Sequence, residues 1–278
     1  MPYPLDVQQI SARLPVRRVG RQIRLLTETT STNDEAFQAA DQLANDGLTI
    51  FAEYQTKGRG RLGRSWLSPR GASILCSVLL FEPDRPAWQG RLVLISAVAV
   101  CDAIRATTNL EPVIRWPNDV LVSGRKLGGI LVESRATGIW PAQAGHAPIS
   151  APMRAFVVGV GINCFQSPAH FPPELRHQAT SLEIESGQPI CRVELARQLL
   201  AELDGWLAES ESLDQERLLQ AWLDRAEPLG QRVRLEHAGR SYLGTTVQIE
   251  PTGALVVELE SGSREVFDPA TTALVALP

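Results

Sequence analysis

The chain has 278 residues, of which 44% are hydrophobic and 21% are charged, so it holds enough apolar matter to close a core. This composition excludes a largely disordered chain, a collagen-like repeat and a disulfide scaffold. The net charge of −4 comes from 27 basic and 31 acidic residues, whereas a dedicated binder of nucleic acid or of membrane surfaces usually carries a basic excess.

The first part of the chain alternates helical and strand patterns. About 25 residues form a lead-in that is too short for a three-helix DNA-binding module and lacks the apolar stretch of a secretory signal. A helix is expected from Ser31 to Asp46, because Ser31 with Asp34, and Thr32 with Glu35, fit capping boxes. Strands are expected at 48–54 and 73–81, and a mostly apolar helix lies within 86–108.

Short strands dominate the middle of the chain. One is expected at 113–116, a hairpin at 120–122 and 127–133, and a further strand at 155–160. Residues 135–153 are rich in Ala, Pro and Gly without periodicity, which predicts a long exposed loop.

The last part of the chain changes character at Pro228-Leu229-Gly230. Before it, 192–207 and 213–225 have helical spacing; after it come about 48 residues of short alternating strands with glycine turns, typical of a small β-barrel. The sequence therefore predicts an α+β fold with two domains, 1–227 and 228–278.

Cysteine and histidine patterns exclude several site types. Cys76, Cys101, Cys164 and Cys191 are too far apart for a zinc knuckle or a CxxC pair, and we expect reduced thiols in a reducing compartment. The four histidines have no ligand spacing, so no protein-built metal site is expected. The longest apolar run, 92–101, is about half of what a bilayer requires. We expect a soluble cytoplasmic protein.

The sharpest motif is the segment Lys57–Trp66, which we call the basic loop. Four cations and three glycines lie in it without an acidic residue. Glycines let a backbone approach a ligand closely, and the cations suit a multiply charged anion such as a nucleotide phosphate or a carboxylate. Trp66 offers a flat face to a heterocycle. A loop that grips RNA backbone, or a solvated loop without any ligand, would have the same composition.

A second motif runs from Arg115 to Ser134. Lys126 begins a strand that continues with Gly128-Gly129, and adjacent glycines in a strand usually mark a close approach. A flat ligand with its acid end toward Lys126 would explain them, and so would a bulge packed against a helix. Asp119 follows a Pro-Asn turn, where it could hold Mg²⁺, orient an amine or cap the turn.

Weaker signals accompany these two. Ser31-Thr32-Asn33 lies at a helix N-terminus, which favours a polar ligand but is equally served by capping. Gln55 ends a strand just before the basic loop, and Gly159 to Asn163 places glycines at a strand end. The sequence contains no convincing Ser-His-Asp or Cys-His set.

In their order and spacing these segments closely resemble the biotin protein ligases, over about residues 25–278. The matching pieces are Ser31-Thr32-Asn33, Glu53-Tyr54-Gln55, Gly58-Arg59-Gly60-Arg61, Gly63-Arg64 with Trp66, Trp116-Pro117-Asn118-Asp119, Lys126 to Glu133, Gly159 to Asn163 and Ala179 to Leu182. The resemblance implies the mixed-sheet catalytic domain of the biotin and lipoate ligases, followed by a small SH3-like domain.

The resemblance also implies a reaction in two steps. Biotin and ATP give biotinyl-5′-AMP and pyrophosphate, with Mg²⁺ expected, and a lysine of a biotin carboxyl carrier domain then takes the biotinyl group. No covalent protein nucleophile is required, so orientation and charge stabilisation would carry most of the rate.

Residue roles follow from the same resemblance. The catalytic set would be Lys126, Arg61 and Asp119, with Asp119 near the incoming lysine and any Mg²⁺. Biotin would be held by Ser31, Thr32, Asn33, Gln55, Arg59, Gly60, Arg61, Lys126, Gly128, Gly129, Gly159 and Gly161. ATP and the adenylate would contact Arg59, Arg61, Arg64, Trp66, Lys126 and Asn163. The basic loop would order over the adenylate and keep water away.

The short lead-in departs from those family members that also repress transcription through an N-terminal DNA-binding domain. We therefore expect no DNA partner and no membrane partner, and a homodimer, if formed, through a sheet edge. A lipoate–protein ligase shares the catalytic fold but lacks the basic-loop pattern. The remaining alternatives are an Arg-Gly-loop nucleic-acid-binding protein and an inactive biotin sensor.

Overall fold

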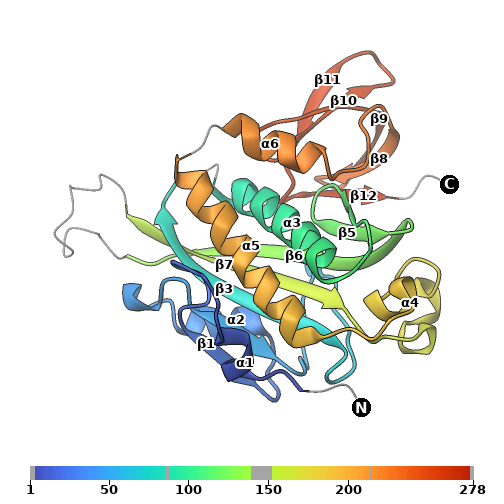
Figure 1. The fold of residues 1–278 in the computed structure, drawn as a ribbon. Helices are drawn as coiled ribbons and strands as arrows, with labels where there is room; N and C mark the ends of the chain where they lie inside the picture. The colour runs from blue at the N-terminus through green and yellow to red at the C-terminus, as the bar shows by residue number, and fades with distance from the viewer. Residues whose placement is uncertain (1–3, 86–87, 139–151, 213–214, 276–278) are drawn as a thin grey trace.

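The computed structural model of this chain describes residues 4–85, 88–138, 152–212 and 215–275, and a seven-stranded mixed sheet organises most of them (Figure 1). Its strand order is β1-β2-β3-β7-β6-β5-β4, with β1 and β2 parallel and the other neighbours antiparallel. The strands are β1 Ile23–Leu26, β2 Thr49–Ala52, β3 Ser73–Pro83, β4 Val113–Arg115, β5 Asp119–Val122, β6 Arg125–Ala136 and β7 Met153–Asn163.

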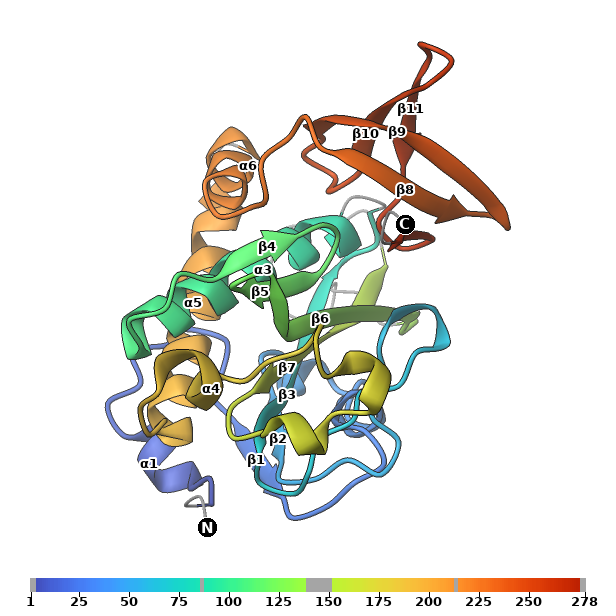
Figure 2. The same cartoon turned by 90° about the vertical axis from the view of Figure 1, so that its right-hand side faces the viewer.

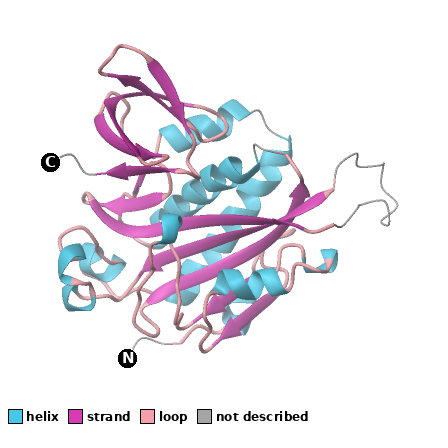
Figure 3. Ribbon diagram, turned by 180° about the vertical axis from the view of Figure 1, so that it is seen from behind, coloured by secondary structure: helices cyan, strands magenta, loops and turns pink. Residues whose placement is uncertain are grey.

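Helices cover both faces of this sheet. The long helices α3 (Trp88–Thr107) and α5 (Arg192–Ser212) lie across one face in Figure 1, and the opposite face, seen from behind in Figure 3, carries the short helix α2 (Thr32–Gln38). The remaining helices are α1 Val7–Ser11, α4 Leu182–Ser186 and α6 Gln215–Leu223, with 3₁₀ turns at Leu43–Asn45, Arg61–Gly63, Pro168–His170 and Pro173–Leu175.

Alternation along the central strands separates two apolar clusters. Because successive strand residues point to opposite faces, Cys76 and Val78 of β3 pack with α3 and α5, whereas Leu79 packs with Phe37 of α2. The larger cluster therefore lies under the long helices. The α2 face has less apolar matter, and that leaves room on it for polar side chains.

The lead-in is more ordered than its length suggested. The Glu53 carboxylate accepts hydrogen bonds from the Leu5 backbone N–H at 2.6 Å and from Arg192 at 2.8 Å, and Arg192 is buried. Asp204 of α5 accepts the backbone N–H groups of residues 17, 18 and 19 at 2.7–2.8 Å. These contacts tie the first 20 residues to α5 and to the end of β2.

The predicted helix from Ser31 to Asp46 is too long. Helix α2 ends at Gln38, where the Asn45 side chain donates to the Ala39 carbonyl at 2.9 Å, and a 3₁₀ turn follows. The predicted capping boxes are also wrong, because Asp34 pairs with Arg59 at 2.8 Å and Glu35 accepts from Thr29 at 2.6 Å. The side chains that were predicted to cap the helix thus bind residues outside α2 instead.

Strands β6 and β7 form one long antiparallel pair, from Gly128 opposite Ile162 to Ala136 opposite Arg154. The loop predicted at 135–153 is therefore shorter at both ends, since Ala136 and Met153 are strand residues. The prediction for residues 139–151 lies outside the described residues.

The C-terminal residues form a separate five-stranded antiparallel sheet in the order β11-β10-β9-β8-β12, above the larger sheet in Figure 2. Its strands are β8 Arg232–His237, β9 Arg240–Ile249, β10 Leu255–Leu259, β11 Arg264–Phe267 and β12 Thr272–Val275. The predicted glycine turns do connect these strands, at Ala238-Gly239, 251–253 and 261–263. The α+β class is confirmed. No helix among the described residues is long and apolar enough to cross a membrane.

Candidate active site

The α2 face of the central strands carries a shallow surface that we call the glycine floor, made of Ser77, Gly129, Gly159 and Gly161. In the strand register Ser77 of β3 lies opposite Gly159 of β7, and Gly161 of β7 lies opposite Gly129 of β6. A side chain added to Gly159 or Gly161 would clash with neighbouring residues. A Cβ atom on Gly159 would lie 2.4 Å from Asn33 Oδ1, and one on Gly161 would lie 2.6 Å from the Trp66 ring.

A continuous chain of polar contacts borders the glycine floor. Gln55 Oε1 accepts from the Thr32 backbone N–H at 2.7 Å and from its hydroxyl at 3.0 Å. The buried Ser77 hydroxyl lies 2.7 Å from Thr32 Oγ1 and 2.6 Å from Asn33 Oδ1. Asn33 Nδ2 donates in turn to Glu133 at 2.7 Å. The chain joins the end of β2, α2, β3 and β6, so it fixes which hydrogen-bonding atoms face this surface.

Arg59 is committed to two carboxylates. Its guanidinium donates to Asp34 at 2.8 Å and to Glu133 at 3.0 Å. The hydrogen bond that Arg59 donates to Asp34 is the main cause that raises the pKa of Arg59, with Glu133 adding to it. These contacts fasten the start of the basic loop to α2 and β6. Arg59 therefore supplies much less free positive charge than its sequence position suggested.

The basic loop closes on itself before it reaches Trp66. The Trp66 N–H donates to Gly58 O at 2.9 Å, and the Gly60 N–H donates to Arg64 O at 2.7 Å. At the tip, Leu62 and Gly63 both take positive φ, 53° and 75°, a conformation that glycine adopts without strain. The closed loop brings the Trp66 ring onto the glycine floor.

Lys126 lies beside that ring. Its ammonium group is 5.9 Å from the Trp66 ring centre and donates to Asp119 Oδ1 at 2.6 Å. The Lys126 backbone is held by the segment before α4, with the Lys126 N–H donating to Gln178 O at 2.7 Å and Thr180 N–H donating to Lys126 O at 2.9 Å. The structure thus fixes a cation and a carboxylate at one end of a flat surface.

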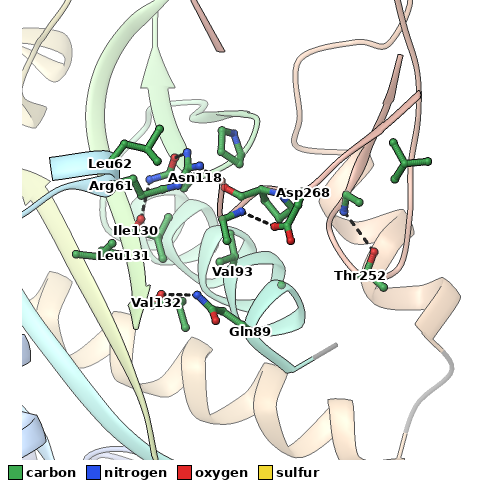
Figure 4. Close-up of a pocket in the computed structure, with 16 residues that line it drawn as sticks. Arg61, Leu62, Gln89, Val93, Asn118, Ile130, Leu131, Val132, Thr252 and Asp268 are labelled. Atoms are coloured by element: carbon green, nitrogen blue, oxygen red, sulfur yellow. Dashed lines mark hydrogen bonds between the residues drawn. The ribbon is translucent and has the colours of Figure 1, made fainter. Parts of the chain in front are cut away.

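Arg61 extends toward the C-terminal sheet, while its guanidinium still interacts electrostatically with Asp119. Its Nη1 donates to Asn118 Oδ1 at 3.1 Å, and its Nη2 donates to Thr272 O at 2.7 Å and to Pro269 O. Burial lowers the pKa of Arg61. This side chain closes one wall of a cavity of about 540 Å³ between the two sheets (Figure 4).

The cavity runs along the edge of β6 that β5 leaves uncovered. Gln89 of α3 donates to Val132 O at 3.0 Å, and Asn118 Nδ2 donates to Ile130 O at 2.7 Å, so side-chain amides cap this edge. Leu62 and Val266 border the cavity and are 54% and 58% exposed. Figure 4 shows the basic loop on one side and the C-terminal sheet on the other.

Several predicted site residues lie elsewhere. Gly128 precedes Gly129 on β6 and so faces away from the glycine floor. Asn163 is buried, with its amide donating to Thr180 O at 3.0 Å and accepting from Gln166 at 2.8 Å. Ser31 is buried at the start of α2 without a side-chain capping bond in the described structure, and Arg64 is exposed.

Three residues that no sequence prediction assigned to the site make contacts with the candidate site residues. Ser77 is a hydroxyl in the middle of an apolar run of β3, and such a residue indicates a buried polar partner. Glu133 and Asn118 lie inside the recognised motifs but were given no role. Both act through contacts with residues more than 50 positions away, Asn118 with Arg61 and Glu133 with Arg59.

The described residues contain no group of three or more His, Cys, Asp or Glu side chains that could hold a metal ion. The Asp119 carboxylate accepts a hydrogen bond from Lys126. This contact already occupies one of the two Asp119 carboxylate oxygens. A metal that reaches this site would have to bring most of its own ligands.

Comparison with known proteins agrees with this geometry. The biotin/lipoate A/B protein ligase family matches residues 24–144, and the biotin protein ligase C terminal domain matches residues 229–269. The biotin--[acetyl-CoA-carboxylase] ligase of Mycobacterium tuberculosis is 33% identical over 271 residues, which cover 95% of this chain and 92% of that protein. The bifunctional ligase/repressor BirA of Bacillus subtilis is 28% identical, with 96% of this chain and 78% of that protein covered.

A solved structure gives the same result for the fold. The biotin protein ligase from Aquifex aeolicus in complex with biotin and ATP superimposes with a TM-score of 0.73 at 25% identity, over 92% of this chain and 99% of that one. Sequence and fold agree over nearly the full length of both proteins. This chain therefore belongs to the biotin protein ligase family.

Proposed function

We propose that this chain activates biotin with ATP and transfers it to a lysine of a biotin carboxyl carrier domain. In the first step a biotin carboxylate oxygen bonds to the α-phosphorus, and the bond from that phosphorus to the β-phosphate oxygen breaks, releasing pyrophosphate. In the second step the carrier lysine amine attacks the carbonyl carbon of biotinyl-5′-AMP. The anhydride C–O bond breaks, AMP leaves, and the amine loses its proton.

One observation carries this proposal: the glycine floor ends at Lys126. A flat bicyclic ligand needs a surface whose own residues carry no side chains, and Gly129, Gly159 and Gly161 provide one, with the Trp66 ring and Asn33 lying against it. Its carboxylate must meet a negatively charged phosphate, so a fixed cation is needed where they react. Lys126 supplies that cation, oriented by Asp119 at 2.6 Å.

The polar chain suits the other end of the ligand. A ureido group offers one carbonyl acceptor and two N–H donors, and Thr32, Gln55 and Ser77 present matching hydroxyl and amide groups. A dithiolane ring, as in lipoate, offers neither. Unsatisfied buried polar groups are costly, so these residues favour the ureido ring over an apolar one.

The cations of the basic loop divide between two roles in this proposal. We assign Arg61 to the reacting anions beside Lys126, whereas Arg59 holds the loop in place through Asp34 and Glu133. Mg²⁺ enters with ATP as part of the substrate, since the described residues contain no group of three or more His, Cys, Asp or Glu side chains that could hold it. Closure of the loop excludes water from the anhydride.

The partners follow from the reaction. The carrier domain is the second substrate, and we place no DNA or membrane in the cycle. We assign the catalytic domain to residues 1–227 and the C-terminal domain to 228–278, a division that the two separate sheets support. We place the reaction in the cytoplasm, where ATP and a carrier are available. A homodimer would form by pairing of a sheet edge.

The test is formation of biotinyl-5′-AMP from biotin, α-labelled ATP and Mg²⁺ without any carrier, with lipoate in parallel. The chain has two lysines, Lys57 and Lys126, so it offers a matched pair of variants. Lys126→Ala is expected to lower adenylate formation at least ~100-fold, because it removes the fixed cation at the reacting atoms. Lys57→Ala removes an exposed lysine and should cost far less.

The outcomes separate the candidates. A biotin-dependent adenylate that Lys126→Ala abolishes supports the proposal. An adenylate with lipoate alone would assign the chain to lipoate ligation. No adenylate with either acid would leave the basic loop as a binding element and would end the enzyme proposal.

A further inference from the structure

The C-terminal sheet meets the catalytic sheet through its β9–β10 turn. The buried Trp116 indole N–H donates to Gly253 O at 2.9 Å. Gly90, in the first turn of α3, lies against the same turn, where a Cβ atom on it would come within 1.8 Å of Thr252 O. Backbone therefore packs directly on backbone, and the indole N–H is the directional bond at this joint.

A second joint lies on the basic loop. Arg61 donates to the carbonyl of Thr272 at 2.7 Å and to that of Pro269, both just before or at the start of β12. Two backbone carbonyls of the C-terminal sheet thus hold the guanidinium that the proposed reaction requires. A displacement of this sheet would displace Arg61 with it.

One short segment connects both joints to the reacting groups. Trp116 binds the C-terminal sheet, Asn118 accepts from Arg61 at 3.1 Å, and Asp119 accepts from Lys126 at 2.6 Å. The three lie within four residues of the chain, directly after β4. Their spacing is fixed, so the direction of Arg61 relative to Lys126 depends on how the C-terminal sheet docks on Trp116.

We propose that Trp116 is a positioning residue of this ligase: its indole N–H docks the C-terminal sheet and thereby aims Arg61 at the anions beside Lys126. The inference rests on the proposed function, because it concerns the same site. Trp116 itself touches no reacting atom. Its effect passes through Arg61, and that distinguishes it from a residue that only stabilises the fold.

The first variant is Trp116→Phe in the full-length chain, which keeps an aromatic ring and removes the N–H donor. Leaving the Gly253 carbonyl without its buried donor is expected to make biotinyl-5′-AMP leave about tenfold faster. The measurement is the dissociation rate of labelled adenylate, together with KM for ATP. We expect KM to rise more than kcat falls.

Trp222→Phe is the matched control. Trp222 lies in α6, is 2% exposed, and its Nε1 has no hydrogen-bond partner among the described residues. The same substitution there removes similar volume from a core but no directional bond. It should leave the adenylate dissociation rate within about twofold of the parent, and an equal effect of both variants would assign Trp116 to general stability.

A double-mutant cycle separates positioning from structure. Residues that act through one another give non-additive effects, so Trp116→Phe should add little in an Arg61→Ala background. Gly90→Ala pushes the same turn away from the other side and should reproduce the effect, again only when Arg61 is present.

Three results would overturn the inference: a parent-like dissociation rate in a folded Trp116→Phe, full additivity with Arg61→Ala, or a Gly90→Ala effect that persists without Arg61. A parent chain that forms no adenylate would instead overturn the proposed function. The two failures are therefore distinguishable in one set of measurements.

Discussion

The glycine floor and the basic loop are built in opposite ways. The floor lies within one sheet, where strand register fixes Ser77 opposite Gly159 and Gly129 opposite Gly161. The loop is fixed from outside, by carboxylates on α2 and β6 and by a C-terminal carbonyl 211 positions away in the chain. In the proposed function, recognition of the ligand ring belongs to the sheet, and control of the charged intermediate belongs to a joint between two sheets.

The largest effect on ligand binding is expected from a substitution in the glycine floor. Gly161→Ala would place a methyl group 2.6 Å from the Trp66 ring, so either the ring or β7 must move. Overpacking of this kind costs about 1–3 kcal/mol, and we expect biotin affinity to fall about 100-fold. Isothermal titration of biotin in the absence of ATP measures it.

Gly205→Ala is the control for that variant. Gly205 lies exposed in α5, with nothing among the described residues within 4 Å of an added Cβ atom. Alanine favours a helix over glycine by about 1 kcal/mol, so this variant should melt slightly higher and bind biotin like the parent. If Gly161→Ala also binds like the parent, the floor is not the ligand surface.

The next effect concerns the loop. Arg61→Ala removes charge-assisted hydrogen bonds that join the loop to the C-terminal sheet, and we expect biotinyl-5′-AMP to leave about 30-fold faster. Biotin affinity should change less than this release rate. Rapid filtration of the preformed labelled complex gives the rate, and retention as tight as in the parent would contradict a sealing role.

A smaller effect is expected from the polar chain beside the floor. Ser77→Ala leaves Asn33 Oδ1 without a buried partner, a loss worth about 1–1.5 kcal/mol, so KM for biotin should rise about tenfold with kcat little changed. Ser96→Ala is the matched control, since Ser96 is also buried but bonds within its own helix, to Leu92 O at 2.6 Å. Equal KM values in both variants would remove Ser77 from ligand recognition.

The smallest effect tests how well the sheet around the floor is sealed. Burial raises the pKa of the thiol of Cys76, which precedes Ser77, and raises those of Cys101 and Cys164 to about 12. A raised pKa lowers the reactive thiolate fraction at pH 8, so iodoacetamide should modify only the exposed Cys191. Peptide mass spectrometry identifies the site, and fast labelling of Cys76 in the native chain would show an open sheet.

The glycine floor could largely be predicted from the sequence, because the signals for it lie within single strands. Glycines at strand positions predicted a close approach, and the Trp66 ring makes that approach. The hairpin of β5 and β6, the long helix α3 and the C-terminal strands also followed from periodicity and turn residues. Strand alternation even separates Gly129 from Gly128, although the prediction grouped the two.

For the basic loop, the sequence predicted only the type of ligand, from the composition of the loop. Four cations predicted an anion site, but nothing local says that Arg59 contacts Asp34 and Glu133, or that Arg61 contacts a backbone carbonyl of β12. The helix from 31 to 46 failed for the same reason, since Asp34 and Glu35 bind outside α2. Pairings over long sequence distances decide which charges remain available, and one sequence does not contain them.

The paired strands β6 and β7 have a consequence for protein engineering. Pairing continues for eight residues beyond Gly128, from its partner Ile162 to the pair of Ala136 with Arg154. At about 3.3 Å per residue, Ala136 lies roughly 10 Å beyond Glu133, the residue of the site furthest along β6, and β3 stays paired with β7 as far as Met153. A fluorescent or affinity module inserted beyond Ala136 would therefore be attached through a three-stranded part of the sheet, outside the contacts that build the site.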